Sequence, residues 1–116
     1  MINFAAYFSD DMILLTGIKF TKIRGIALWP FVLVQTKNPG QTLINHERIH
    51  LRQQAETGIV LFYFWYVTEW LWHFVRLRNW WAAYHQISFE KEAYRNETNL
   101  DYLKNRKLWS FVKYIR

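Results

Sequence analysis

The sequence predicts an α+β fold, mainly α, in which a small N-terminal β-hairpin or sheet precedes about four helices. The chain has 116 residues, which suits one hydrophobic core, and it contains no internal repeat or linker-like segment. Residues 26–35 are rich in β-branched and aromatic side chains, whereas long segments without helix breakers follow Gly58. We therefore expect residues 1–116 to form a single domain.

The expected hairpin lies on either side of Gly25. Residues 18–23 alternate between apolar and polar side chains, and residues 26–35 are rich in β-branched and aromatic ones. Pro30 falls inside the second segment and cannot donate a hydrogen bond to a neighbouring strand. The second segment is therefore predicted to be an edge strand or a bulged strand, and an edge strand offers a docking place for an extended peptide.

The helices are predicted from the spacing of apolar residues and from the residues that interrupt it. A turn at residues 37–40 precedes the first helix, and Gly58 ends it. The second helix is followed by a turn near Arg78. The four expected helices cover about residues 41–57, 59–76, 80–96 and 99–114, and the last of them is basic and amphipathic.

The composition restricts the chemistry of the chain. It has no cysteine, which excludes disulfides, thiolate zinc sites and cysteine catalysis, so a transition metal must bind to His, Asp or Glu. The net charge of +6 would attract nucleic acid or anionic lipid alike. Aromatic residues make up 20% of the chain, more than a core of this size encloses, so some of them face a membrane interface, a partner or a substrate.

The sequence also bears on location. Its first eleven residues lack the basic n-region of a secretory signal. The most apolar segment, residues 58–75, is interrupted by Glu69 and His73 and is short for a membrane span. We therefore expect a cytoplasmic protein that can associate peripherally with the inner face of a membrane.

One short motif predicts a metal site. Residues 46–50 read His-Glu-Arg-Ile-His, the H-E-x-x-H pattern, within the first expected helix. His46 and His50 are four residues apart and lie on one face, so their imidazoles can share a zinc ion. Glu47 is displaced by about 100° around the helix, away from the ion but beside its open position. This places Glu47 as a general base.

A catalytic zinc ion has three protein ligands and a water molecule, so a further ligand is required. Glu56 would be that ligand in the pattern H-E-x-x-H-x-x-G-x-x-H, but Gln53 stands where that pattern needs glycine. Without the glycine turn a continuing helix points Glu56 away, which leaves it as a solvated carboxylate or one that supports the site from outside.

The helix at residues 80–96 is the better source of the third ligand. Glu90, Ala93, Tyr94 and Glu97 share one face of it, and the small Ala93 allows close approach to the first helix. We expect Glu90 to be the ligand, with Glu97 in reserve. Glu92 points elsewhere and is expected to be solvated.

The two motifs, His46 to His50 and Glu90-Lys-Glu-Ala93, make the chain resemble the gluzincin clan of zinc metallopeptidases. The second motif is similar to the E-x-x-A-D element of the membrane CAAX-protease and heat-shock peptidase group and of the β-lactam sensor peptidases. Tyr94 stands where those families have aspartate. The resemblance implies a minimal zincin-like domain with metalloendopeptidase activity on a peptide or protein. Residues 26–35 are similar in position to the edge strand on which such enzymes bind the substrate backbone.

The chemistry implied is hydrolysis by a zinc-activated water molecule, with Glu47 taking its proton. A donor for the tetrahedral oxyanion is also required, and the candidates on the helix of Glu90 are Tyr84, His85 and Tyr94. His73 lies among aromatic residues and is expected to be a packing histidine.

Other functions stay open at this stage. The ion could be purely structural, in a non-catalytic interaction module, and then Glu47 would have no role. Membrane-surface binding is a further hypothesis, and it depends on the basic C-terminal helix and on Trp65, Trp70, Trp72, Trp80 and Trp81. Nucleic-acid binding is not favoured because no known module is present. The sequence gives no indication of an oligomeric state.

Overall fold

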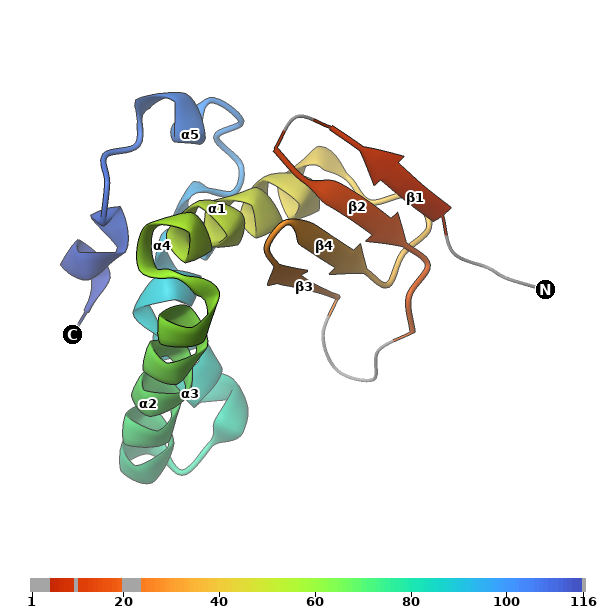
Figure 1. The fold of residues 1–116 in the computed structure, drawn as a ribbon. Helices are drawn as coiled ribbons and strands as arrows, with labels where there is room; N and C mark the ends of the chain where they lie inside the picture. The colour runs from red at the N-terminus through yellow and green to blue at the C-terminus, as the bar shows by residue number, and fades with distance from the viewer. Residues whose placement is uncertain (1–4, 10, 20–23, 116) are drawn as a thin grey trace.

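The computed structural model describes residues 5–9, 11–19 and 24–115, and it confirms the predicted fold class. A four-stranded sheet at the N-terminus is followed by helices (Figure 1). The elements are β1 (Ala5–Phe8), β2 (Ile13–Thr16), β3 (Gly25–Leu28), β4 (Phe31–Val34), α1 (Gln41–Thr57), α2 (Ile59–Leu77), α3 (Trp80–Gln86), α4 (Ser88–Asn96), α5 (Tyr102–Asn105) and the 3-10 helix η1 (Ser110–Tyr114).

The sheet has the strand order β1-β2-β4-β3, with β2 and β4 parallel and the two outer pairs antiparallel. Alternate residues of the central strands are buried, as a strand with one covered face requires. The core under the sheet combines residues of β2, β3 and β4 with Met12 before β2 and one buried side chain of α1: Leu14, Ala27, Val32, Val34, Met12 and Leu51. The sheet therefore holds α1 in place through its apolar face.

The hairpin differs from the predicted one. Residues 26–35 do not form a single strand, because β3 and β4 are joined by a tight turn that contains Pro30. Pro30 therefore occupies a turn, where it needs no partner for a backbone N–H, and β3 becomes the edge strand. Of the other expected strand, residues 20–23 lie outside the described residues, and β1 and β2 were not predicted.

Helix α1 begins and ends where the sequence predicts. Gly40 precedes it, and Gly58 ends it at a φ of +86°, a backbone conformation that residues other than glycine rarely adopt. Its buried face is unusual because most of it is polar: Asn45, His46, Glu47, Ile49, His50, Leu51, Gln53 and Gln54. Such groups remain buried only where they have partners, so this face requires a site.

The predicted helix at residues 80–96 is two helices, because the backbone is extended at Ile87. The Ile87 side chain is fully buried in a second core with Phe62, Phe89 and Phe111. Glu69 of α2 accepts hydrogen bonds at the start of α4 from the backbone N–H of Ser88 (2.7 Å) and from its hydroxyl (2.6 Å). These bonds cap α4 and fix it against α2.

The far end of α4 is fixed to α1. The side-chain amide of Asn45 contacts three carbonyl oxygens at and after the end of α4, those of Asn96 (3.3 Å), Glu97 (2.8 Å) and Asn99 (3.0 Å). With both of its ends bound, α4 is held beside the polar face of α1.

The prediction of one amphipathic helix at residues 99–114 is wrong. The chain forms the short helix α5, passes through an extended conformation at Arg106, and then forms η1. The guanidinium of Arg106 is fully enclosed between Glu56 and Glu92. Burial of this side chain draws the chain inward and interrupts the helical pattern.

Within residues 5–9, 11–19 and 24–115, no helix combines the length and the apolar character needed to cross a membrane.

Candidate metal centre

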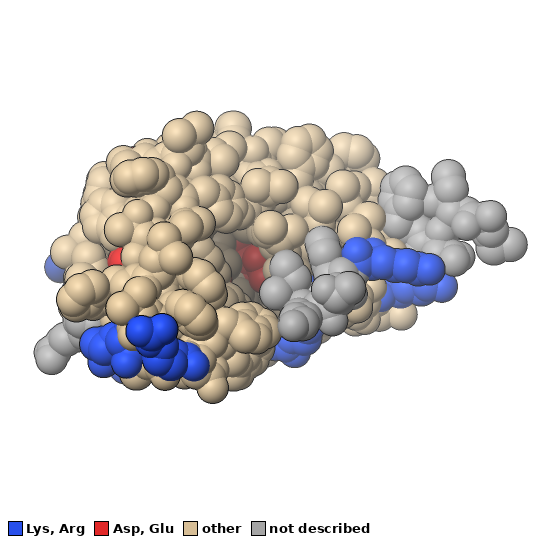
Figure 2. Space-filling model, turned by 90° about the horizontal axis from the view of Figure 1, so that it is seen from below, with Lys and Arg blue, Asp and Glu red and all other residues tan. Residues whose placement is uncertain are grey.

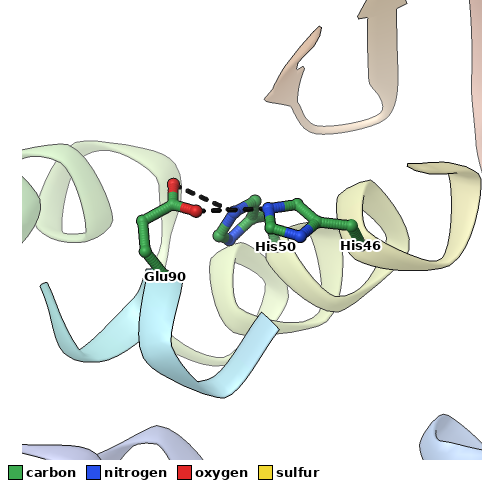
Figure 3. Close-up of side chains that lie close together, drawn as sticks. All are labelled: His46, His50 and Glu90. Atoms are coloured by element: carbon green, nitrogen blue, oxygen red, sulfur yellow. Dashed lines mark hydrogen bonds and ion pairs between the residues drawn. The ribbon is translucent and has the colours of Figure 1, made fainter. Parts of the chain in front are cut away.

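Three buried side chains from α1 and α4 meet at one point (Figure 3). The Nε2 atom of His46 lies 3.2 Å from one oxygen of Glu90, and the Nε2 atom of His50 lies 3.1 Å from the other. The candidate ligand atoms of the three residues all lie within 4.8 Å of one another. The structure therefore brings together the residues that the sequence predicts as ligands.

The outer nitrogens of both imidazoles are held by hydrogen bonds. The Nδ1 atom of His46 lies 2.8 Å from a carboxylate oxygen of Glu97, and that of His50 lies 2.8 Å from the side-chain oxygen of Gln53. Both oxygens are acceptors, so each Nδ1 carries a proton, and each Nε2 is directed toward Glu90, where it can hold a second proton or a metal ion. Glu97, the predicted reserve ligand, therefore orients His46 and lies outside the group of three.

This arrangement requires a positive charge at the centre. Two imidazole lone pairs and a carboxylate repel one another unless a proton or a metal ion lies between them. Burial opposes charge on His50, but the Glu90 carboxylate more than offsets it and raises the pKa of His50 to about 9. Burial likewise opposes charge on Glu90, and His50 and His46 hold its pKa well below the usual value.

Tyr66 of α2 supports the third ligand. Its hydroxyl donates to the second oxygen of Glu90 at 2.6 Å. Burial and the nearby Glu90 carboxylate raise the pKa of Tyr66 well above its usual value, so the hydroxyl keeps its proton. This bond helps to fix the orientation of the Glu90 carboxylate.

Glu47 lies next to the three residues without joining them. It is 4% exposed, its Oε1 atom has no hydrogen-bond partner, and burial raises its pKa. A side chain at Gly25 would place its Cβ 3.2 Å from the Oε2 atom of Glu47, so glycine is needed for the close approach of β3. A buried carboxylate oxygen without a partner is costly and indicates a site for a ligand or water.

Glu47, His50 and Glu90 line one side of a cavity of about 350 Å³, whereas His46 lines a smaller neighbouring pocket. Figure 2 shows the hollow from below, with acidic atoms inside it; the acidic residues among its lining are Glu47 and Glu90. The other walls are mainly aromatic, and their aromatic residues come from α2 and α3: Phe62, Tyr63, Tyr66, Trp70, Trp80 and Tyr84. The cavity therefore combines a polar floor with apolar walls.

The three candidates for oxyanion binding lie in different places. Tyr84 lines the cavity and its hydroxyl lies 3.1 Å from that of Tyr94. The ring of Tyr94 packs edge-on against His46 at 4.5 Å between centroids, and His85 packs between Trp81 and Tyr94. Tyr84 is thus the candidate that faces the cavity, whereas His85 has a packing role.

Two glutamates differ from the predictions. Glu92 is fully buried instead of solvated, and Arg106, Tyr102 and Gln53 donate hydrogen bonds to it. Glu56 pairs with the same guanidinium through both of its oxygens. We call this group, Arg106 with Glu56, Glu92, Tyr102 and Gln53, the Arg106 cluster.

Three residues of the site were not predicted. Gln53 lies three positions after His50 on the same helix, and this spacing was the signal that could have identified it. Tyr66 and Gly25 reach the site only through the packing of α2 and β3, and no local pattern indicates them.

The donor set fits zinc, which binds histidine nitrogen and carboxylate oxygen in catalytic sites with three protein ligands. The two orienting acceptors at Nδ1 match the support that such ligands require. Comparisons of this chain with protein-family models, with curated proteins and with solved structures found no match. The resemblance to gluzincins therefore depends on the two motifs and on this geometry.

Proposed function

We propose that this protein is a zinc-dependent peptidase that hydrolyses peptide bonds, with His46, His50 and Glu90 as the zinc ligands and Glu47 as the general base. The observation that carries the proposal is the convergence of two imidazoles and Glu90 beside Glu47, a buried carboxylate with one unpartnered oxygen, where His50, Glu90 and Glu47 line an aromatic cavity. Together these features supply the ligand set, the base and the substrate space that such a reaction needs.

The chemistry can be assigned to residues. When bound by the three ligands, zinc supplies acidity to a water molecule and polarises the substrate carbonyl. Glu47 accepts the proton of the attacking water and then passes it to the leaving amine. Its raised pKa suits both steps, because a carboxyl that is too acidic would not hold the proton.

The cavity indicates the substrate. Its aromatic walls suit a bulky apolar side chain next to the cleaved bond. The edge strand β3 runs along the same cavity, but its Ala27 carbonyl already accepts hydrogen bonds from Gln54 and Tyr63. A peptide strand added to β3 would therefore pair near Gly25, beside Glu47.

Metal analysis and cleavage assays test the proposal together. The purified protein is expected to contain one zinc ion per chain, and His46→Ala and Glu90→Ala are expected to lose it. In a quenched-fluorescence peptide library with apolar residues, Glu47→Gln is expected to keep zinc and to lose about 10²–10⁴-fold in rate. The exposed Arg52 on the same helix provides a control, since Arg52→Gln should leave both zinc and rate unchanged.

Two outcomes would overturn the proposal. Wild-type protein that binds no zinc when it is supplied would remove the site itself. Stoichiometric zinc without any Glu47-dependent cleavage would instead identify a structural ion in a non-catalytic interaction module.

Gly25 offers a second test that changes no ligand. Gly25→Ala is expected to displace Glu47 or β3 and to lower the cleavage rate while zinc stays bound, because the added Cβ meets Glu47 at 3.2 Å. Gly40→Ala is the matched control, since a Cβ there meets nothing within 4 Å. Equal rates in the two variants would show that close approach of β3 to Glu47 is not needed.

A further inference from the structure

The outer face of α2 is apolar and exposed along most of its length. Its side chains are between 50% and 86% exposed, and they share one side of the helix: Val60, Phe64, Val67, Leu71, Trp72 and Val75. We call these residues the outer face of α2. A soluble helix normally places polar residues on such a side, so this face indicates a partner.

The exposed charged groups at the end of this face are basic. The acidic residue of α2, Glu69, points inward and accepts hydrogen bonds from Trp65 and Ser88. Arg76 and Arg78, at the end of the helix, are exposed. Cations therefore border the outer face, and the carboxylate of the helix does not reach it.

The rest of the surface reinforces this asymmetry. Among the described residues, only Asp11 and Asp101 are acidic and classed as exposed. Asp11 lies between β1 and β2 and pairs with Arg48, and Asp101 pairs with Lys104 before α5. Figure 2, which looks onto the end of α2 at the α2–α3 turn, shows basic groups toward the margins of the view and few acidic atoms.

We propose that the outer face of α2 docks on an anionic lipid surface, with its apolar side chains in the interface and Arg76 and Arg78 against lipid phosphates. An amphipathic helix that lies in the plane of a membrane combines these two features, and Trp72 suits the headgroup level. The arginines supply the charge complementarity that selects anionic lipid.

A second copy of the chain fits this face less well. A symmetric dimer would bring two equivalent surfaces together and with them the arginines that border each face. Helix α2 exposes no carboxylate that could pair with those arginines across such a dimer. An anionic surface neutralises them, whereas another copy does not.

The docked orientation has a consequence for the cavity, which rests on the proposed peptidase function. Val67 belongs to the outer face and also lines the cavity, and Trp70 and Trp80 lie among the lining residues. The cavity therefore borders the docking surface. Docking in this way would present the site to apolar peptide segments held at a membrane.

Vesicle sedimentation tests the docking. Wild-type protein is expected to bind vesicles of seven parts phosphatidylcholine to three parts phosphatidylglycerol, to bind pure phosphatidylcholine more weakly, and to be released by salt. Phe64→Ser with Leu71→Ser should weaken binding to both kinds of vesicle by about tenfold or more. Arg76→Gln with Arg78→Gln should weaken binding to the anionic vesicles alone.

Controls separate docking from folding and from activity. Leu108→Ser removes an apolar side chain that is 77% exposed but lies outside α2, and Arg52→Gln with Arg95→Gln removes two exposed cations from α1 and α4. Both are expected to bind vesicles as the wild type does. Circular dichroism melting checks that every variant is folded. Glu47→Gln should also bind normally, so docking can be judged even if no peptidase activity is found.

Two results would overturn this inference. Absence of wild-type binding to the anionic vesicles, or equal binding by the wild type and the Phe64→Ser, Leu71→Ser variant, would show that the outer face does not contact lipid. A wild-type dimer in sedimentation equilibrium that this variant dissociates, without vesicle binding, would identify the face as a subunit interface.

Discussion

Glu90 and Glu92 are two buried glutamates on one short helix, yet they meet opposite surroundings. Glu92 receives hydrogen bonds from a guanidinium, a tyrosine hydroxyl and a side-chain amide in the Arg106 cluster. Glu90 faces two imidazole nitrogens and one tyrosine hydroxyl. The first carboxylate has a permanent positive charge beside it, whereas the second depends on a proton or a metal ion.

The difference separates a structural cluster from a binding site. A buried carboxylate with a permanent cation and full hydrogen bonding has no capacity for a further ligand. Glu90 keeps that capacity because each of its imidazole neighbours can release a proton and bind a metal ion in its place. Burial alone does not distinguish the two glutamates; the kind of partner does.

The largest expected effect is at the structural cluster. Arg106→Met would leave Glu56 and Glu92 buried without their cation, and we expect the free energy of unfolding to fall by about 3–5 kcal/mol. Urea unfolding measures this loss. Lys104→Met is the control, because the exposed pair of Lys104 with Asp101 contributes about 1 kcal/mol or less. Similar losses in both variants would contradict a structural role for the Arg106 cluster.

The next prediction compares the two glutamates directly. Zinc at about one hundred times its dissociation constant should add about 2.7 kcal/mol to the stability of the wild type. Glu92→Gln should start from a lower stability but gain a similar increment, whereas Glu90→Gln should gain little or none. Thermal unfolding with and without zinc measures each increment. A normal increment in Glu90→Gln would remove it from the ligand set.

Gln53 contacts both regions, so its replacement should lower both zinc affinity and stability. It accepts from His50 and donates to Glu92, and Gln53→Leu is expected to lower zinc affinity by about 10–100-fold and stability by about 1–3 kcal/mol. Gln54 is equally buried but binds the backbone of β3 and the following turn. Gln54→Leu should therefore lose stability without losing zinc affinity, as calorimetric titration can show.

The smallest effect is a dependence on pH. Burial raises the pKa of Glu92, but hydrogen bonds from Arg106 and Tyr102 more than offset it, so the pKa in the folded protein is lowered from 4.5. The ionised Glu92 carboxylate therefore stabilises the fold fully above the unfolded pKa of 4.5, and this contribution is lost as the pH falls through the folded pKa. The stability difference between the wild type and Glu92→Gln should therefore shrink as the pH falls from above the unfolded pKa of 4.5 through the lower folded pKa. A difference that stays constant over this range would contradict a role for the ionised Glu92 carboxylate.

The fold class was predictable because it depends on local patterns. Gly58 and the turn near Arg78 mark the ends of α1 and α2 in the sequence itself. The parallel pairing of β2 with β4 depends on contacts between distant segments, and strands of four residues leave little periodicity to detect. Arg106 shows the same limit, because its burial overrides an amphipathic pattern that otherwise favours a helix.

The candidate site divides in the same way. His46, Glu47 and His50 follow from a spacing within one helix, and Glu90 was predicted from the face that it shares with the small Ala93 on a later helix. Glu92 was expected to be solvated because no pattern near it in the sequence indicates that Arg106 contacts it. Tyr66 and Gly25 reach the site through tertiary packing alone.

The hydrogen bonds from α2 to α4 have a thermodynamic consequence. Tyr66 bonds to Glu90, and Glu69 bonds to the first residue of α4, so α2 contacts the Glu90 helix at two points. If contact with a surface on one side of α2 changes zinc affinity by some factor, bound zinc must change affinity for that surface by the same factor. Measuring either equilibrium in the presence of the other ligand would give one coupling free energy from two independent experiments.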